Sequence, residues 1–380
     1  MKAIKYSVIS VFSIIILGLL TMFIIWASYP KKKINLFVLD KTAKDFEYSQ
    51  HKSLFWILNN ERFVMKDGSN YSVTDDYYGF FPMDDKEYRI HHVSLEQIDS
   101  ISDSYDALYY TDAYGVNFDE WFRGFKAGLN GEKSFIDGGL NQNDYLLMKA
   151  MMDKKKLVIG EYSILENPTS DLIRYKTEEL LGVHFTGWLG IYFEVLDSSA
   201  NVVPSWLINA YKANNSNQWP FKKGGLVFYN ASNVIVLEMD KQLNYDKIII
   251  ETSDTLQKAY GLPQFINYYN WFEVVVAADT NKILANYRIN LTSDGDSIML
   301  ANNLKSRFPA IIANFNNNNK MYYFAGDFSV NYVPSYLARL ANSRSWLKKI
   351  TRKDQKMFFH NYYFPLVNGI LENYSKGLKN

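Results

Sequence analysis

The segment KKLVIGEYS at residues 155–163 places a short apolar run directly before Gly160 and Glu161. A run of this kind is typical of a strand in a parallel sheet, because helices cover both faces of such a sheet and bury it. The segment INLFVLD at 34–40 repeats the pattern and ends in Asp40, and YDALYY at 105–110 precedes Asp112. We therefore expect three buried strands that each lead to a carboxylate.

Amphipathic stretches separate and follow these apolar runs. Residues 51–60, 144–152 and 171–181 carry apolar side chains at helical spacing, and Gly182 follows the last of them as a helix cap would. Alternation of strand and helix over about 150 residues predicts an α/β fold with a doubly wound parallel sheet. Ligands of such sheets bind beyond the carboxyl ends of the strands, which is where the three carboxylates fall.

The chain divides into segments by composition. We expect residues 34–196 to form the first part of the α/β domain, 197–305 a β-rich insertion or second lobe, and 306–340 a return to the α/β domain. Residues 341–380 are basic and aromatic and predict amphipathic helices. These helices either pack against the domain, or lie on a membrane surface or against a partner.

The N-terminal segment is strongly apolar. After a short tail at 1–5, residues 6–29 contain no charged side chain, and Trp26 and Tyr29 lie near the end of the run. Twenty-four residues suffice for a helix that crosses a bilayer. A cleaved signal peptide is the alternative, but its apolar region is shorter, and Ala27-Ser28-Tyr29 is a poor cleavage site. The sequence therefore favours an uncleaved anchor.

The orientation of this anchor is not decided by the flanking charges. Lys2 and Lys5 precede the span and three lysines follow it at 31–33, so the positive-inside rule favours neither side. A large domain behind an N-terminal anchor is usually exported. We expect a single-pass protein of the cytoplasmic (inner) membrane whose main domain is extracytoplasmic.

Composition excludes several classes of function. Lys and Arg number 41 and Asp and Glu 40, for a net charge of +1, so no basic face for nucleic acid is expected. The absence of cysteine excludes disulfides, zinc-thiolate sites, iron–sulfur clusters and cysteine nucleophiles. His91 and His92 are adjacent and would face opposite sides of a strand, while His51, His184 and His360 are isolated. We expect no metal and no cofactor.

The order of these elements resembles the class I glutamine amidotransferase-like fold. Residues 34–40 resemble its opening strand, 105–115 the strand and loop that supply an oxyanion-binding turn, and 155–163 the strand and turn that present the nucleophile. A late strand followed by Ala325-Gly326-Asp327 is similar to the closing region. The resemblance covers 34–196 and 308–330, about half of the chain.

The chain departs from that family at its catalytic positions. Glu161 stands where active members carry the nucleophilic cysteine, and Asp327-Phe328-Ser329 stands where a His-x-Glu pair is expected. The resemblance thus implies a degenerate member without glutaminase activity by the family mechanism. Residues 164–169 and 181–193 are reminiscent of uncharacterised membrane-anchored bacterial proteins of this fold.

Three residues allow two interpretations each. We expect Glu161 at a strand-to-helix elbow, exposed at the top of the sheet and backed by a helix N-terminus. Glu161 and Asp112 suit an acid–base pair acting on a glycoside, or they cap helices and bind loop amides. Trp188 suits a stacking platform for sugar rings, or it belongs to the core. The candidate ligand-binding residues are Asp40, Asp112, Tyr114, Glu161, Trp188 and Asp327.

These features predict a membrane-anchored, catalytically degenerate protein that binds or scaffolds a glycan or a protein partner in cell-envelope polysaccharide metabolism. The first alternative is a carbohydrate-active hydrolase or lyase that uses Glu161 and Asp112, and a Glu161 closed off from solvent would count against it. The second alternative is a purely structural assembly component. The predicted partners are the bilayer, through residues 6–29, a glycan ligand and an envelope protein.

Overall fold

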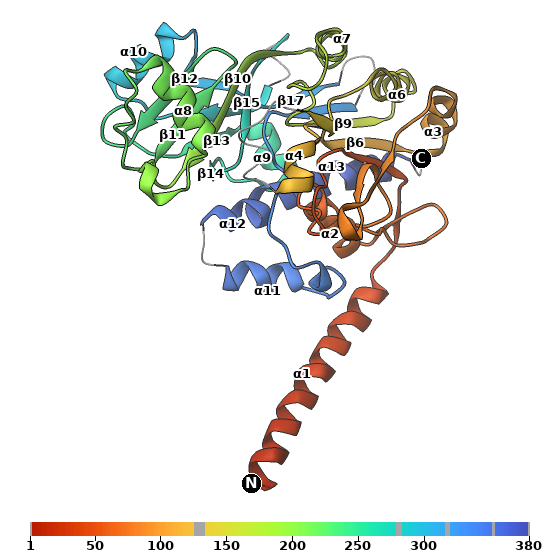
Figure 1. The fold of residues 1–380 in the computed structure, drawn as a ribbon. Coiled ribbons are helices and arrows are strands. Elements are labelled where there is room, and N and C mark those ends of the chain that lie inside the picture. Colours follow the sequence, from red (N-terminus) through yellow and green to blue (C-terminus); the bar gives the residue numbers. More distant parts are fainter. Residues whose placement is uncertain (1, 125–133, 279–282, 316–319, 352–353, 379–380) are drawn as a thin grey trace.

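The computed structural model describes residues 2–124, 134–278, 283–315, 320–351 and 354–378. The chain forms a mixed α/β domain and a long N-terminal helix that extends away from it (Figure 1). Two sheets form the framework of the domain, one of ten strands and one of four.

The larger sheet runs through the whole domain. Its strands, in spatial order, are β14 (Phe265–Tyr268), β13 (Ile248–Thr252), β16 (Ile283–Arg288), β17 (Arg307–Asn314), β18 (Lys320–Phe324), β9 (Leu157–Glu161), β6 (Ala107–Asp112), β2 (Leu36–Asp40), β4 (Tyr78–Pro82) and β5 (Tyr88–His91). All residues of β2, β6 and β9 are buried, as expected for strands that helices cover on both faces.

The predicted parallel sheet is the centre of a mixed one. The five strands from β18 to β4 pair in parallel, whereas β5 at one end and β17, β16, β13 and β14 at the other pair antiparallel. The expectation of a wholly parallel sheet is therefore corrected. Within the strand-rich residues 248–314, β13, β14, β16 and β17 add to the edge of the parallel core. The sheet therefore continues past the part that alternates with helices.

Helices cover both faces of the parallel core. On one face lie α3 (Ile98–Ser104), α6 (Gln142–Asp153) and α7 (Asp171–Leu181); on the other lie α2 (Lys52–Asn60), α9 (Asp254–Tyr260) and α13 (Phe364–Gly377) (Figure 1). The predicted helix at 171–181 agrees with the structure at both ends. Gly182 adopts the left-handed conformation that ends it, with φ 64°.

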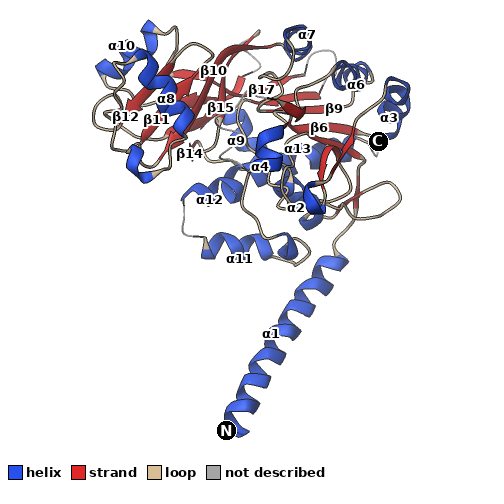
Figure 2. Ribbon diagram, in the orientation of Figure 1, coloured by secondary structure: helices blue, strands red, loops and turns tan. Residues whose placement is uncertain are grey.

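The smaller sheet packs beside the larger one (Figure 2). Its antiparallel strands, in spatial order, are β12 (Val234–Glu238), β11 (Gly225–Tyr229), β10 (Val183–Phe193) and β15 (Phe272–Ala277). The predicted hairpin around Asn230 is the β11–β12 pair. In β10 the register shifts between Phe185 and Leu189, and Gly187 at that bulge has φ 84°.

Shorter elements complete the fold. They are β1 (Lys32–Lys33), β3 (Phe63–Val64), β7 (Val116–Asn117), β8 (Phe135–Asp137), α4 (Phe118–Arg123), α8 (Ser205–Asn214), α10 (Ser293–Ala301), α11 (Ser343–Ile350), α12 (Asp354–Phe358) and the π-helical turn Phe359–Tyr363. The aromatic side chains of the π-helical turn are buried, and Tyr363 lies within hydrogen-bond distance of Tyr109 in β6. This part of the basic-aromatic segment packs against the domain.

The N-terminal helix α1 (Lys2–Ser28) contains one candidate membrane span, Ile9–Ser28, almost all of it exposed. By length and composition it is either a membrane helix or a signal sequence. Its last turns contact the domain: the indole N–H of Trp26 donates to the Asn59 carbonyl oxygen (2.9 Å), and the Arg62 guanidinium lies 4.5 Å from the Trp26 ring centroid. Trp26 is only 3% exposed.

One glycine permits the close pairing of β2 and β4. Gly79 lies opposite Asp40 with φ 123°, and a Cβ at this position would lie 1.9 Å from the Asp40 carbonyl oxygen.

We expect Gly79→Ala to lower the free energy of unfolding by about 3 kcal/mol or more, since both backbone strain and overlap with Asp40 oppose the substitution. Gly261→Ala is the matched control, because Gly261 has φ 66° with nothing within 4 Å of its Cβ position. We expect it to lose about 1 kcal/mol in the same denaturant titration; equal losses would refute the overlap.

Candidate functional site

A row of four acidic residues crosses the carboxyl edge of the parallel core. Asp40, Asp112 and Glu161 are the last residues of β2, β6 and β9, which are adjacent strands. Asp327 follows β18, the next strand along. The sequence-based expectation that these side chains gather at one edge agrees with this placement; their role in ligand binding stays a prediction.

Asp40 forms a buried pair with His51. The Asp40 Oδ2 lies 2.6 Å from His51 Nδ1, and its Oδ1 accepts the Thr42 backbone N–H at 2.8 Å. The His51 Nε2 lies 2.9 Å from the Val73 carbonyl oxygen, which can only accept a hydrogen bond. His51 Nε2 therefore carries a proton, and a second proton lies between His51 and Asp40. The pair is neutral overall, which allows it to be fully buried.

Asp112 is held by three donors on a single oxygen. Its Oδ1 accepts from the hydroxyls of Thr42 (2.8 Å) and Ser163 (2.6 Å) and from the Tyr114 backbone N–H (2.8 Å). Burial, together with the charge of Asp40, still raises the pKa of Asp112 to about 6. These bonds identify Asp112 as a ligand of loop amides and hydroxyls, one of the two interpretations that the sequence leaves open.

Ser163 occupies a strained turn two residues after β9. Its φ of 74° lies in the left-handed region, which is costly for residues other than glycine. Its hydroxyl donates to Asp112 and accepts the backbone N–H groups of Ala113 (3.0 Å) and Tyr114 (3.1 Å). Ser163 is fully buried, so in this conformation its hydroxyl joins two loops and does not face solvent.

Glu161 and Asp327 are buried carboxyls that favour the protonated form. Burial raises the pKa of Glu161 well above its ordinary value, and the charge of Asp327 acts in the same direction. Burial likewise raises the pKa of Asp327, followed by the charges of Asp112 and Asp40. The Glu161 Oε1 accepts the Ser329 backbone N–H at 2.7 Å. The Asp327 Oδ1 has no hydrogen-bond partner among the described residues.

A strand of the smaller sheet closes the carboxyl edge. Glu273 in β15 is fully buried; its Oε1 accepts the Ser163 backbone N–H (3.0 Å) and its Oε2 accepts the Tyr323 hydroxyl. The Glu273 backbone N–H donates to the Ala325 carbonyl oxygen (3.0 Å). The smaller sheet thus covers the ends of β9 and β18, where an open α/β sheet would leave a crevice.

This cover corrects two expectations about Glu161. The sequence interpretation places Glu161 at an exposed elbow backed by a helix, whereas the side chain is 0% exposed. The next helix, α7, begins only at Asp171. The backbone at Ser329 and the β15 strand fill the space instead. A closed-off Glu161 counts against a glycosidase that uses Glu161 and Asp112, since neither carboxyl faces an open cleft.

Trp188 and Tyr114 do not form an exposed stacking platform. Trp188 is 8% exposed and belongs to the main hydrophobic core, which supports the second of its two interpretations. Tyr114 is partly buried, and burial, with the nearby Glu166 and Glu120, raises its pKa to about 12. Of the six predicted ligand residues, four gather at the strand ends, Tyr114 lies beside them, and Trp188 lies in the core.

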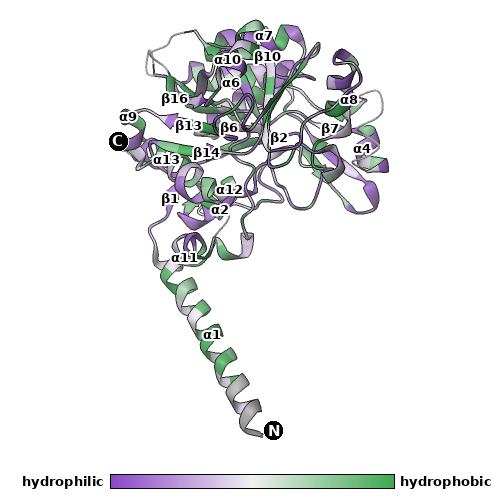
Figure 3. Cartoon of the chain, turned by 90° about the vertical axis from the view of Figure 1, so that its left-hand side faces the viewer, coloured by the Kyte–Doolittle hydropathy of each residue, from purple (hydrophilic) through white to green (hydrophobic). Residues whose placement is uncertain are grey.

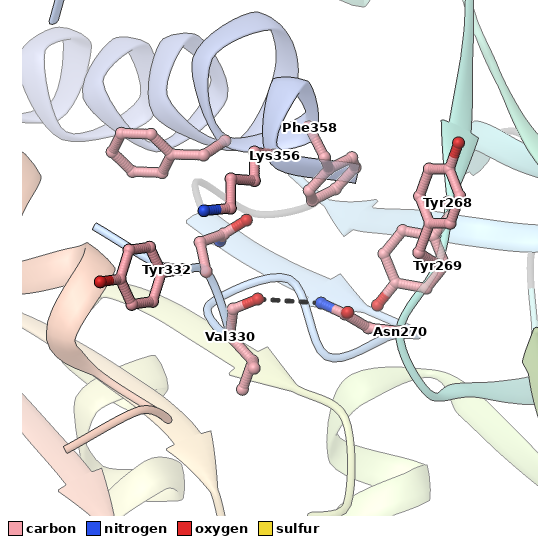
Figure 4. A pocket seen from close by; sticks show the side chains of 9 residues that line it. Tyr268, Tyr269, Asn270, Val330, Tyr332, Lys356 and Phe358 are labelled. Carbon is pink, nitrogen blue, oxygen red and sulfur yellow. Dashed lines mark hydrogen bonds between the residues drawn. The ribbon is translucent and has the colours of Figure 1, made fainter. Parts of the chain in front are cut away.

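A small cavity of about 230 Å³ lies between Asn270, Tyr332 and Lys356. Figure 4 shows its lining, with Asn270 donating to the Val330 carbonyl oxygen (2.9 Å) and Lys356 beside Tyr332. Asn270 also donates to the Asp327 carbonyl oxygen (3.0 Å). The cavity is smaller than most ligand sites, which measure about 300–1,000 Å³.

A larger groove of about 720 Å³ lies where the loop after β9 meets the smaller sheet. Its walls come from that loop, from α7, from the bulge of β10 at Gly187 and from the β11–β12 turn. The groove is lined by aromatic, amide, hydroxyl and charged side chains, among them Asn167, Arg174, Tyr175, Glu178, His184, Thr186, Tyr229, Asn230 and Ser232. Tyr175 is 62% exposed. α7 lies at the end of the domain remote from α1 (Figures 1 and 3).

Sequence reasoning missed several polar partners at the strand ends. His51 is isolated in the sequence, so nothing there indicates its contact with Asp40, and Ser163 lies in no Gly-x-Ser-x-Gly pattern. Glu273 carried a usable signal, since it is a lone carboxylate inside the apolar run 272–277. Within the described ranges, no group of three or more His, Asp or Glu side chains is arranged to hold a metal ion.

Comparisons with known proteins add little to this geometry. No family model matches the chain, and no curated protein matches it. Among solved structures, the chain is similar to one described as a putative ThuA-like protein from Bacteroides uniformis ATCC 8492. The similarity extends over 90% of this chain and 91% of that chain, at 10% sequence identity and a TM-score of 0.39. The assignment of a mixed α/β fold rests on the strand order given above.

Glu273 makes stability depend on pH. Burial raises the pKa of Glu273 from 4.5 to about 7, so the folded state holds this proton more tightly than the unfolded state does. Its stabilising contribution is complete below about pH 4.5 and is lost as the pH rises through 7. Between these pH values, the free energy of unfolding should decrease in both proteins by different amounts. We expect the decrease to be about 3 kcal/mol smaller in Glu273→Gln than in the wild type, because glutamine does not titrate.

Denaturant titrations at several pH values between 4 and 8 measure this difference. Glu179→Gln replaces an exposed glutamate on α7 and is the control; it should follow the wild-type profile. A Glu273→Gln profile parallel to that of the wild type would mean that the folded state holds this proton no more tightly than the unfolded state does.

Proposed function

We propose that this chain is a membrane-anchored, extracytoplasmic binding protein that holds a glycan of the cell envelope in the groove between α7 and the smaller sheet. We place it as a degenerate relative of class I glutamine amidotransferases, with binding in place of catalysis. The observation that carries the proposal is the groove itself. Its volume, about 720 Å³, exceeds that of the cavity at Asn270, and aromatic, amide and hydroxyl groups line it together.

The chemistry of the groove suits a sugar. Exposed aromatic rings stack on the apolar faces of pyranose rings, and amide and hydroxyl groups bond to their hydroxyls. Tyr175 supplies an exposed ring, while Asn167, Asn230 and Ser232 supply neutral hydrogen-bonding groups. The acidic and basic residues largely pair with one another: Arg174 with Asp171, and His184 with Glu178 at 3.0 Å. A neutral polar ligand therefore fits better than a strongly charged one.

The sealed strand ends support binding over hydrolysis. Glu161, Ser163 and Glu273 are fully buried. One carboxylate oxygen of each glutamate accepts a backbone N–H, and the Ser163 hydroxyl donates to Asp112. A catalytic carboxyl must reach its substrate within hydrogen-bond distance. No such approach is open to Glu161 in this arrangement, whereas the groove beside it is open to solvent.

The contacts of α1 support an uncleaved anchor. Trp26 is buried between Asn59 and Arg62, and a guanidinium nitrogen of Arg62 donates to the Ala27 carbonyl oxygen (3.3 Å). Cleavage of the helix near Ala27 would therefore remove a buried tryptophan from the folded domain. Loss of a large buried aromatic side chain typically lowers the free energy of unfolding by several kcal/mol. Signal sequences have no such part in the mature fold.

Glycan binding is testable with the full-length protein in lipid nanodiscs. On an array of bacterial envelope glycans we expect selective binding, which calorimetry then quantifies. Tyr175→Ala should weaken the affinity by about tenfold, since it removes one stacking ring. Leu172→Ala is the matched control: Leu172 is equally exposed, at 62%, on the same helix, but does not line the groove.

Two outcomes would contradict the proposal. One is the absence of binding to any glycan, which would favour a protein partner. The other is an equal loss of affinity in both variants, which would place the ligand outside the groove. Trp188→Ala is not a useful probe of binding, because the loss of a core tryptophan acts first on stability.

Retention of the anchor is checked by peptide mapping of the protein purified from membranes. We expect the tryptic peptide that runs from residue 6 to 31 to be present and uncut. The orientation is checked in intact cells with Tyr175→Cys, whose thiol is the only one in the chain. A membrane-impermeant maleimide should label it; labelling only after the membrane is permeabilised would place the domain in the cytoplasm.

A further inference from the structure

The domain contacts α1 at residues that lie within the candidate membrane span. The Ala341 backbone N–H donates to the Met22 carbonyl oxygen at 3.1 Å, and Trp26 is buried against Asn59 one turn later. Both contacts lie within Ile9–Ser28. The loop that carries Ala341 therefore touches the part of α1 that is apolar enough to lie in a membrane.

The depth of this contact follows from helix geometry. Met22 precedes Ser28 by six residues, which is about 9 Å along the helix axis. Between Met22 and Trp26, the side chains of Phe23, Ile24 and Ile25 are 44%, 59% and 42% exposed. In water these side chains would be unfavourably hydrated, at roughly 25 cal/mol per Å² of apolar surface. When α1 crosses a bilayer, the membrane surface therefore reaches the level of Ile25, and Ala341 lies at the level of the lipid headgroups.

The helix α11 begins two residues after this contact. It lies beside the end of α1, on the side of the domain from which α1 leaves, in both views (Figures 1 and 3). One face of α11 is fixed to the domain: Leu347 is buried, and Arg344 donates to the His360 carbonyl oxygen at 2.6 Å. The other face is not covered. Trp346 and Ile350, four residues apart, are 51% and 54% exposed.

The uncovered face of α11 has the composition of an interfacial helix. Trp346 and Ile350 form an apolar strip, and Lys348 and Lys349 occupy the last turn. Tryptophan concentrates at the level of the headgroups, and lysine is attracted to anionic lipid by about 1 kcal/mol per residue. Helices of this kind lie in the plane of the interface with their apolar side chains a few ångströms deep.

We propose that α11 is a second membrane contact, which lies on the surface of the bilayer that α1 crosses. Trp346 and Ile350 enter the headgroup region, and Lys348 and Lys349, in the last turn of the helix, add positive charge close to lipid phosphates. The occupant of this face is the bilayer because α11 continues directly from the loop bonded to Met22. The inference rests on the anchoring part of the proposed function and is independent of the glycan.

The absence of native cysteine makes a depth measurement direct. Single-cysteine variants of the full chain are labelled with an environment-sensitive fluorophore and reconstituted in vesicles of phosphatidylcholine and phosphatidylglycerol. Nitroxide-labelled lipids then quench the fluorophore according to its depth. Trp346→Cys and Ile350→Cys report on α11, Ile14→Cys reports on the middle of α1, and Tyr175→Cys on α7 is the matched surface control. Ile14 and Tyr175 are 70% and 62% exposed.

We expect strong quenching at 346 and 350 by headgroup-level nitroxides, strong quenching at 14 by deep nitroxides, and little at 175. Quenching at 14 combined with control-level quenching at 346 and 350 would overturn the proposal while the anchor stands. Absence of quenching at 14 would overturn the anchor and this proposal together. In the Ile350→Cys background, the double variant Lys348→Glu, Lys349→Glu should lose part of the quenching at 350 in anionic vesicles and little in pure phosphatidylcholine. Equal quenching with and without the double substitution in anionic vesicles would contradict the role of the two lysines.

Discussion

Burial of four carboxyl groups at the ends of adjacent strands is the constraint on which the centre of this structure depends. An isolated charge is too costly to bury, so each group must be paired, bonded or protonated. Asp40 shares a proton with His51, Asp112 accepts three hydrogen bonds on one oxygen, and Glu161 and Asp327 have raised pKa values. The loops after β2, β6 and β9 are fixed because their hydroxyl and N–H groups supply these bonds.

The smaller sheet is tied to the same constraint. Glu273 reaches from β15 to the Ser163 N–H, 110 residues away in the chain, and Ser163 in turn bonds to Asp112. A single chain of hydrogen bonds therefore joins the two sheets across the edge where an α/β fold usually keeps its ligand crevice. The larger groove lies to one side of this edge, between α7 and the β11–β12 turn.

The sequence predicts local features such as buried strands and helix ends. It does not predict which distant segments cover the ends of those strands. The buried runs at 36–40 and 157–161 and the helix ending at Gly182 are visible because periodicity and capping are local signals. The gathering of Asp40, Asp112, Glu161 and Asp327 also follows, since parallel strands end at one edge. The burial of Glu161 does not, because Ser329 and β15 are distant in sequence. The mixed sheet escaped prediction for the same reason: antiparallel strands at 248–314 join the edge of a core formed from other segments.

The N-terminal helix and the groove lie at opposite ends of the domain. The contacts between α1 and the domain decide whether the groove faces a fixed direction relative to α1. A flexible tether would let the groove face any direction. Here Trp26, Asn59 and Arg62 fix the end of α1 to the domain, and the bond between Ala341 and Met22 adds a second point of attachment. Two attachments restrict the rotation of the domain about the helix axis as well as its tilt. These contacts set the direction of α1 relative to the domain. If α1 is the proposed anchor, they hold the α7 end of the domain away from the membrane.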